Sequence, residues 1–229
     1  MKVGFFDSGF GGLCILRAFQ RRCPGVATEY VGDSEHCPYG NRPDDEIFAL
    51  SDACVRKLLA KGCAMVVVAC NTATAAAIDR LRKKYPEVPF VGLEPAIKPA
   101  ALRSKSGVVA VLATRGTFNG RLYNETKARF AKNITVIATV ADEFVAEVEK
   151  LKGADVESLP AAKRRRLERI VRARIEPLLA AGADHIVLGC THFPHLRPII
   201  ERIAAGRAAV LDPSDAVAAQ VERVMKKLM

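Results

Sequence analysis

Two fifteen-residue stretches of the chain repeat one pattern, and this repeat limits the folds that the chain can adopt. Residues 58–72 read LLAKGCAMVVVACNT and residues 178–192 read LLAAGADHIVLGCTH, with six identical positions at a constant offset of 120. In each copy a glycine, Gly62 or Gly182, ends a predicted helix, and a short apolar run follows that suits a strand buried on both faces of a parallel sheet. Each predicted strand stops at a cysteine, Cys70 or Cys190. The repeat predicts an α/β fold with two related halves.

The two cysteines lie where open parallel sheets usually bind their ligands, beyond the carboxyl ends of the strands. If the halves pack around a shared cleft, a pseudo-two-fold axis places Cys70 and Cys190 on opposite sides of one bound molecule. Two opposed bases suggest inversion at carbon. The alternative is that both are ordinary core cysteines, because free cysteine is often buried as a small hydrophobe. The hydroxyl and amide side chains that follow each cysteine favour a functional site.

Length and composition bound the class of protein. A chain of 229 residues is long enough for two domains of roughly 100 residues, each with its own core. No apolar run approaches the ~20 residues of a membrane span, and residues 1–7 lack the apolar segment of a signal peptide. The seven cysteines are odd in number and none has the two-residue spacing of a zinc or thioredoxin-type motif. We therefore expect a soluble cytoplasmic protein with free thiols and no membrane partner.

The net charge of +10 raises the question of nucleic-acid binding. Residues 163–174 hold seven Lys and Arg against one Glu and so carry +6 of that charge. An apolar stripe runs through the same window, which indicates one solvated face of an amphipathic helix. No aromatic residues are interleaved there to stack on bases. We predict no specific nucleic-acid partner; the alternative is that this basic helix binds nucleic acid or a regulatory protein.

Other strand ends also carry polar residues. The predicted strand 3–6 is followed by Asp7 and a glycine-rich turn, which lacks both the third glycine of a dinucleotide fingerprint and a Walker lysine. Asp7 is either a helix N-cap or an active-site residue. Residues 38–40 read Pro-Tyr-Gly, which is either turn chemistry or part of a binding loop. In the second half, the predicted strand 108–113 ends at the polar turn 114–117.

The residues after the two cysteines predict their electrostatic surroundings. Residues 71–81 should form a helix whose N-terminus favours a thiolate at Cys70, and we expect the same at Cys190. Cys190, His192 and His195 could also be read as metal ligands. Against this, the sequence offers no second ligand cluster and Pro194 disrupts regular spacing, so no metal site is predicted.

Taken together, the motifs resemble those of the glutamate racemases, within the cofactor-independent aspartate/glutamate racemase superfamily. They occur in order along nearly the whole chain, and the segments around Asp7 and Cys190 are the ones that resemble the glutamate branch. The motifs are Asp7-Ser8-Gly9-Phe10-Gly11-Gly12-Leu13, Pro38-Tyr39-Gly40, Ala69-Cys70-Asn71-Thr72-Ala73-Thr74, Glu94-Pro95-Ala96-Ile97-Lys98-Pro99, Thr114-Arg115-Gly116-Thr117 and Leu188-Gly189-Cys190-Thr191-His192-Phe193-Pro194.

The resemblance implies two flavodoxin-like three-layer α/β domains with mainly parallel sheets, related by a pseudo-two-fold axis. Residues 1–93 plus 207–229 would form the first domain, with the last strand and helix returning to it, and residues 94–206 the second, with the active site between them. It also implies a cytoplasmic homodimer that interconverts L- and D-glutamate without a cofactor and supplies D-glutamate for peptidoglycan, and hence for cell wall and cell shape. Aspartate or hydantoin racemisation is the nearest alternative.

The resemblance assigns roles to individual residues. Cys70 and Cys190 would be the two acid/base residues, with Asp7 supporting Cys70 and His192 supporting Cys190. Glu149 matches an acidic partner of the histidine, although residues 141–143 replace a usual Cys-Pro, and Gly120 replaces a frequent serine. The residues that match substrate-binding positions are Asp7, Ser8, Pro38, Tyr39, Gly40, Asn71, Thr72, Thr114, Thr117, Thr191 and His192.

Overall fold

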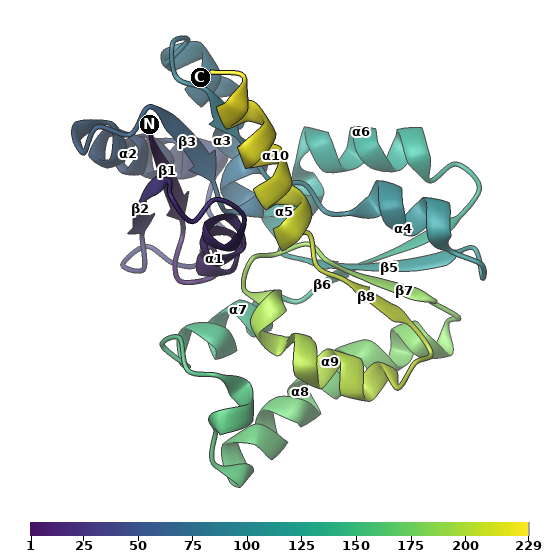
Figure 1. The fold of residues 1–229 in the computed structure, drawn as a ribbon. Coiled ribbons are helices and arrows are strands. Elements are labelled where there is room, and N and C mark those ends of the chain that lie inside the picture. Colours follow the sequence, from purple (N-terminus) through teal and green to yellow (C-terminus); the bar gives the residue numbers. More distant parts are fainter. Residues whose placement is uncertain (229) are drawn as a thin grey trace.

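Two four-stranded parallel sheets form the centre of the molecule in the computed structural model, which describes residues 1–228 (Figure 1). The first sheet has the order β2-β1-β3-β4 and the second the order β6-β5-β7-β8, so the same topology is used twice. This confirms the predicted fold class. The strands are β1 (Lys2–Asp7), β2 (Ala27–Gly32), β3 (Met65–Val68), β4 (Phe90–Val91), β5 (Val108–Ala113), β6 (Thr135–Val140), β7 (His185–Leu188) and β8 (Ala209–Leu211).

Helices cover both faces of each sheet, which gives three layers in each half (Figure 1). In the first half, α1 and α10 pack on one face and α2 and α3 on the other. In the second half, α7, α8 and α9 cover one face, and α4 and α6 cover the other. The helices are α1 (Leu13–Arg22), α2 (Asp44–Ala60), α3 (Asn71–Lys84), α4 (Ile97–Arg103), α5 (Arg115–Asn119), α6 (Arg121–Phe130), α7 (Asp142–Glu149), α8 (Ala161–Ala180), α9 (Arg197–Ala204) and α10 (Ser214–Lys226), with short 3₁₀ turns η1 (Val156–Ser158) and η2 (Phe193–Leu196).

The central strands are apolar on both sides because both sides are covered. In β3, Met65 and Val67 face the α1/α10 layer, while Val66 and Val68 face the α2/α3 layer. All four side chains are fully buried. Successive side chains of a strand point to opposite faces, so a strand covered on both faces needs a continuous apolar run rather than alternation.

The helices that precede the two signature strands end as the repeat predicts. Gly62 and Gly182 have φ of +76° and +85°. Glycine adopts this left-handed conformation without the steric cost that a Cβ brings, and it terminates α2 and α8 just before β3 and β7. The two signatures therefore fold into equivalent helix, turn and strand units.

The end of the chain differs from the expectation. The strand β8 pairs in parallel with β7, with His185 opposite Ala209, so it belongs to the second sheet. The expected return of residues 207–211 to the first domain is wrong, because the backbone of β8 pairs with the edge of β7 that β5 leaves free. The helix α10 packs on α1 in the first half. We therefore propose a division of the described residues into 1–93 plus 212–228 and 94–211.

Candidate active site

A small cavity lies between the carboxyl ends of the two sheets and brings most of the predicted site residues together. Both signature cysteines line it, and so do residues from the loops after β1, β2 and β5. Its volume is only about 10 Å³, which is room for about one water molecule. The lining residues are Ser8, Pro38, Tyr39, Gly40, Cys70, Asn71, Thr72, Thr114, Val145, Cys190, Thr191 and His192.

Cys70 is the N-cap of α3. Its Sγ accepts a hydrogen bond from Ala73 N–H at 3.4 Å and lies 3.6 Å from Ser8 Oγ. Even so, burial raises the pKa of the Cys70 thiol to about 12, and the Asp7 carboxylate acts in the same direction. The expected helix N-terminus is present at Cys70 and its Ala73 N–H acts to lower the pKa, but desolvation of the buried sulfur outweighs this effect.

Cys190 has different surroundings from Cys70. It is followed by a turn and by η2, not directly by an α-helix, so the expected helix N-terminus at this cysteine is wrong. Burial raises the pKa of the Cys190 thiol well above its ordinary value, and Cys70 and Asp7 add to the rise. The side chain of His192 can exchange a proton with Cys190, because its Nδ1 lies 3.7 Å from Cys190 Sγ.

Glu149 fixes the other side of the His192 ring. Its Oε1 lies 2.5 Å from His192 Nε2 and also accepts a hydrogen bond from Phe10 N–H at 3.0 Å. Although burial opposes ionisation of Glu149, the hydrogen bonds from His192 and Phe10 lower the pKa of its carboxyl group. An ionised Glu149 orients the imidazole, so Cys190, His192 and Glu149 are in contact in that order, from the cavity to a partly exposed carboxylate. Glu149 itself does not line the cavity.

Asp7 also lies behind the lining and holds two loops together. It is completely buried, and its Oδ2 accepts hydrogen bonds from Gly9 N–H and Gly12 N–H at 3.1 Å each. Its Oδ1 accepts a hydrogen bond from Thr191 Oγ1 at 3.3 Å, which joins the first half to the loop that carries Cys190. Burial raises the pKa of Asp7 despite the opposing effects of these amides and of His192. Asp7 is thus a carboxyl group poised beside Cys70 and able to hold a proton.

Hydroxyl groups from both halves meet across the cavity. Thr72 Oγ1 lies 2.8 Å from Thr114 Oγ1, which in turn lies 3.0 Å from Thr117 Oγ1. Thr117 therefore supports the lining from behind. The backbone also crosses here, because Gly116 N–H donates to Gly40 O at 3.1 Å. These contacts close the cavity between the halves.

Asn71 is a buried polar group without a partner. The residue is 3% exposed, and neither its Oδ1 nor its Nδ2 has a hydrogen-bond partner among residues 1–228. A buried amide without partners is costly, so this group favours a ligand that hydrogen-bonds to it. Tyr39, by contrast, lines the cavity but has its hydroxyl group partnered, because it donates to Asp33 Oδ2 at 2.7 Å.

Two residues near the cavity carry no signal in the sequence. Val145 lines the cavity from α7, but in the sequence it is one apolar residue of an amphipathic helix. Cys37 lies with Glu149 and His192 in a group whose donor atoms are all within 4.8 Å of one another. Among residues 1–228, these three side chains are the ones close enough together to bind one metal ion. The set considered from the sequence, Cys190, His192 and His195, is not brought together in this way.

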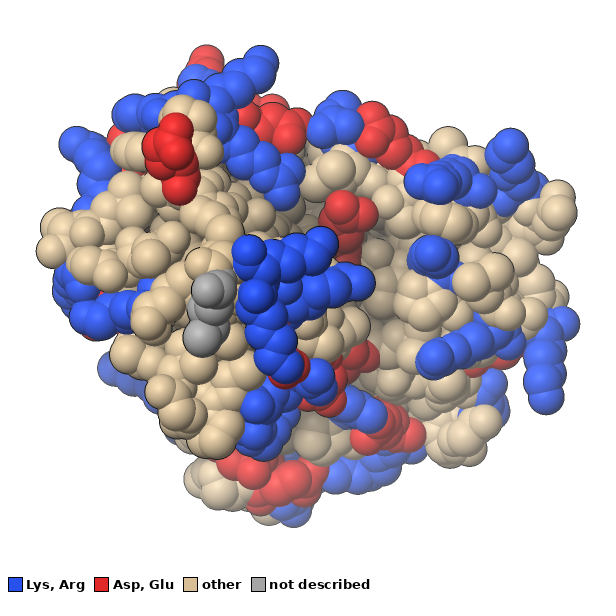
Figure 2. Space-filling model, turned by 45° about the horizontal axis from the view of Figure 1, so that its top comes forward, with Lys and Arg blue, Asp and Glu red and all other residues tan. Residues whose placement is uncertain are grey.

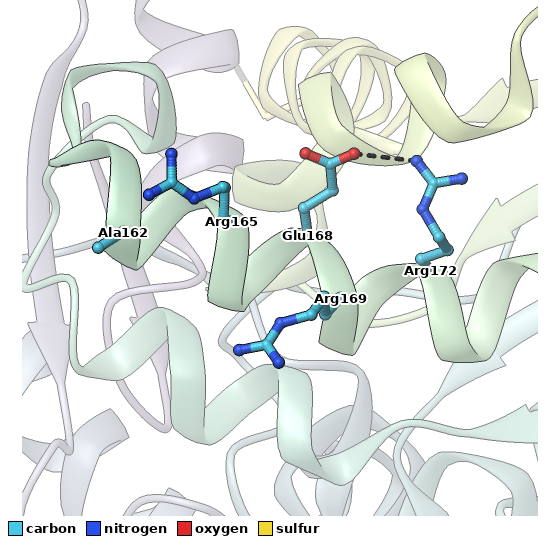
Figure 3. A pocket seen from close by; sticks show the side chains of 5 residues that line it. All are labelled: Ala162, Arg165, Glu168, Arg169 and Arg172. Atoms are coloured by element: carbon cyan, nitrogen blue, oxygen red, sulfur yellow. Dashed lines mark hydrogen bonds and ion pairs between the residues drawn. The ribbon is translucent and has the colours of Figure 1, made fainter.

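The basic helix α8 contributes no residue to the lining of this cavity. Figure 3 shows Arg165 and Arg169 projecting from it, and Arg172 paired with Glu168 at 2.9 Å. These side chains and Ala162 line an open hollow of about 420 Å³ that contains residues of one helix alone. Four of the seven cations of residues 163–174 form ion pairs, namely Arg164, Arg166, Arg172 and Arg174.

Charges of both signs also occur together elsewhere on the surface. Figure 2 shows Lys and Arg side chains interspersed with Asp and Glu across one face. Within residues 1–228, no helix is both long enough and apolar enough to cross a membrane.

A family model described as Asp/Glu/Hydantoin racemase matches residues 14–221 of the chain. The chain belongs to this racemase family. The predicted resemblance is therefore confirmed, and so is the prediction of a racemase. The glutamate racemase of Roseiflexus sp. (strain RS-1) is 42% identical over 225 residues, which cover 98% of this chain and 79% of that protein.

Solved structures of family members share the fold. The crystal structure of Escherichia coli glutamate racemase, in complex with L-glutamate and the activator UDP-MurNAc-ala, aligns with a TM-score of 0.82 at 32% identity. That alignment covers 98% of this chain and 82% of the other. The glutamate racemase from Aquifex pyrophilus aligns with a TM-score of 0.74 at 32% identity, over 98% of this chain and 84% of that one.

Proposed function

We propose that this racemase interconverts L- and D-glutamate by a two-base mechanism, with Cys70 and Cys190 as the acid and the base. The observation that carries the proposal is that these cysteines, at the carboxyl ends of the equivalent strands β3 and β7, line one cavity from the two halves. A thiol on each side of the substrate can remove the Cα proton from one face and deliver a proton to the other. The names of the similar proteins support glutamate as the substrate.

The cavity supplies hydrogen-bond donors for the substrate carboxylate. A thiol has an unperturbed pKa of about 8.5, far below that of an amino acid's Cα–H, so the developing carbanion needs electrostatic stabilisation. The N-terminus of α3 and the unpartnered amide of Asn71 face the cavity from the first half. Hydroxyls of Thr72, Thr114 and Thr191 complete a polar lining. These groups provide the stabilisation without any group beyond the protein itself.

Each thiol has its own proton partner. Asp7 is buried beside Cys70 and its raised pKa suits it to hold the proton that Cys70 gives up. His192 serves Cys190 in the same way, because its Nδ1 faces the sulfur and its Nε2 is held by Glu149. One cysteine must enter each turnover as thiolate and the other as thiol. The substrate ammonium group, entering the cavity, favours the thiolate by its positive charge.

Loss of optical activity tests this function directly. The protein, in buffer free of metals and cofactors, is incubated with L-glutamate or with L-aspartate, and circular dichroism follows each solution. We expect the glutamate signal to decay to zero and the aspartate signal to persist. Decay with aspartate alone would move the assignment to a sister activity, and no decay with glutamate would reject the proposal.

The remaining functional assignments follow from glutamate racemisation. We propose that the protein works in the cytoplasm and supplies D-glutamate for peptidoglycan, as the resemblance implies. The assembly as a homodimer stays a prediction, and sedimentation measurements test it.

A further inference from the structure

A cluster of three metal-ligand side chains lies at the edge of the cleft. Cys37 comes from the loop after β2, Glu149 from the end of α7, and His192 from the loop after β7. Their sulfur, carboxylate and imidazole donor atoms all lie within 4.8 Å of one another. Donor atoms around a tetrahedral zinc ion lie about 3 to 4 Å apart, so a bound ion would replace the hydrogen bond between Glu149 Oε1 and His192 Nε2 and contact Cys37 Sγ as its third protein ligand.

The surroundings leave space for the cluster and orient it. A Cβ on Gly9 would collide with Glu149 Oε1 and lie 3.2 Å from Cys37 Sγ, so the glycine keeps this space open. Phe10 N–H donates to Glu149 Oε1, which fixes the carboxylate and leaves its second oxygen available. Hydrogen bonds of this kind hold ligands in place at metal sites.

Cys37 and Glu149 are partly exposed, so an ion can reach the cluster from solvent. The catalytic thiols of Cys70 and Cys190, in contrast, lie in the closed cavity.

We propose that Cys37, Glu149 and His192 form a three-ligand site for a thiophilic divalent cation, which inhibits the racemase when it binds. The predicted inhibition rests on the proposed function, whereas the predicted binding of the ion does not. Charge balance favours a 2+ ion, because a Cys37 thiolate and the Glu149 carboxylate supply two negative charges and a neutral imidazole supplies none. Sulfur and nitrogen donors select zinc-like ions over magnesium or calcium.

Binding of the ion would prevent His192 from accepting the proton of the Cys190 thiol. The Cys37 thiol proton is released to solvent, and His192 binds the ion through Nε2 as a neutral imidazole that carries its proton on Nδ1. That nitrogen faces Cys190 Sγ at 3.7 Å, so while the ion is bound it cannot accept the thiol proton. The ion would also link the loop after β2 in the first half to two elements of the second, which restrains opening of the cleft.

Cobalt absorption tests the site without reference to turnover. Co²⁺ is added to the metal-free protein, and the thiolate-to-cobalt charge-transfer band is recorded for wild type, Cys37→Ser and the control Cys23→Ser at the end of α1. We expect the band in wild type and in Cys23→Ser, and its loss in Cys37→Ser. No band in wild type, or an undiminished band in Cys37→Ser, would overturn the site. Far-ultraviolet circular dichroism checks folding, and Glu149→Gln provides a second variant in which the affinity for Co²⁺ should fall at least tenfold.

Inhibition by Zn²⁺ tests the consequence. Each variant is compared with its own metal-free rate of glutamate racemisation, and a chelator is then added to check reversal. We expect half-inhibition of Cys37→Ser to need at least tenfold more Zn²⁺ than that of wild type or Cys23→Ser. Equal inhibition of all three would place the ion on Cys70 or Cys190 and reject the proposal. A Cys37-dependent cobalt band in a protein without racemase activity would instead uphold the site and reject the proposed function.

Discussion

The sulfurs of Cys70 and Cys190, the two cysteines that line the cavity, have different partners. Cys70 lies at the N-terminus of α3 beside Ser8 and Asp7, whereas Cys190 has the ring of His192 as its partner. Both pKa values are raised by burial, so both cysteines are thiols while the cavity is closed and without substrate. The family resemblance, rather than these partners, predicts that Cys70 acts on D-glutamate and Cys190 on L-glutamate.

Replacing either cysteine should abolish racemisation. We expect Cys70→Ala and Cys190→Ala to lose at least about 10⁴-fold in rate, because each removes one of the two faces of proton transfer. By the family resemblance, Cys190→Ala should still exchange the Cα proton of D-glutamate with solvent deuterium without inversion, and Cys70→Ala that of L-glutamate. Proton NMR in D₂O measures the exchange. Racemisation within about tenfold of wild type in either variant would contradict two bases, and Cys63→Ala serves as the control.

Glu149 should set the activity of His192 without touching the substrate. Glu149→Gln removes the charge that orients the imidazole, and we expect a fall in kcat of about 10- to 100-fold with a smaller change in KM. Glu147→Gln, on the same helix but paired with Arg166 and Lys150, is the matched control. Steady-state kinetics in both directions give the answer. Equal kcat for the two variants would show that Glu149 does not support His192 in catalysis.

The same carboxyl group should link stability to pH. The pKa of Glu149 is lower in the folded protein than its ordinary value, so its stabilising effect is complete above the ordinary carboxyl pKa of about 4.3 and is lost as the pH falls through the folded value. Urea unfolding should therefore show wild type more stable than Glu149→Gln by about 1 to 3 kcal/mol at pH 7, and by less below pH 4. A stability difference that does not shrink on acidification would disagree with this assignment.

At the scale of elements, the two signature units depend on the way in which their helices end. Gly62 and Gly182 each have positive φ, which costs a residue with a Cβ about 1 to 2 kcal/mol. We expect Gly62→Ala and Gly182→Ala to lower the free energy of unfolding by about that amount each. Gly25, which has open space around its Cα and no positive φ, provides the control, and Gly25→Ala should be neutral or slightly stabilising. Urea denaturation of the three variants compares them.

The helix α8 should be dispensable for catalysis. Its outer face carries Arg165 and Arg169, and it belongs to the layer that covers the second sheet rather than to the cavity. Neutralising Arg165, Arg169 and Arg172 to Gln should leave the racemisation rate within about twofold of wild type, since surface charges act weakly at a distance in salt. A gel-shift assay at physiological salt should show only weak, nonspecific DNA binding in wild type. Tight binding that the three changes abolish would instead favour the nucleic-acid interpretation of this helix.

At the scale of the whole molecule, we expect the two halves to move apart when substrate enters. The cavity of about 10 Å³ has room for about one water molecule, and the bond from Gly116 N–H to Gly40 O and the contact of Thr72 with Thr114 join the halves across it. We expect hydrogen exchange to show protection of the amides of residues 114–119 in the presence of glutamate, since the ligand holds the halves together. Slow exchange of these amides that glutamate leaves unchanged would indicate a cavity that does not open in this way.

The repeated halves, the two buried strands and the positions of both cysteines could be predicted from the sequence. These features depend on local patterns: an apolar run, a glycine that permits positive φ, and a polar residue where a strand stops. The family motifs then identified the residues that line the cavity, Val145 excepted.

Features that depend on partners distant in the chain could not be predicted from the sequence. The strand β8 joins the second sheet because the free edge of β7 is there to pair with it. Burial in the closed cavity overrides the helix dipole at Cys70, since desolvation depends on everything packed around the sulfur. Cys37 meets Glu149 and His192 only because loops from both halves converge at the cleft, and no spacing along the chain encodes that meeting.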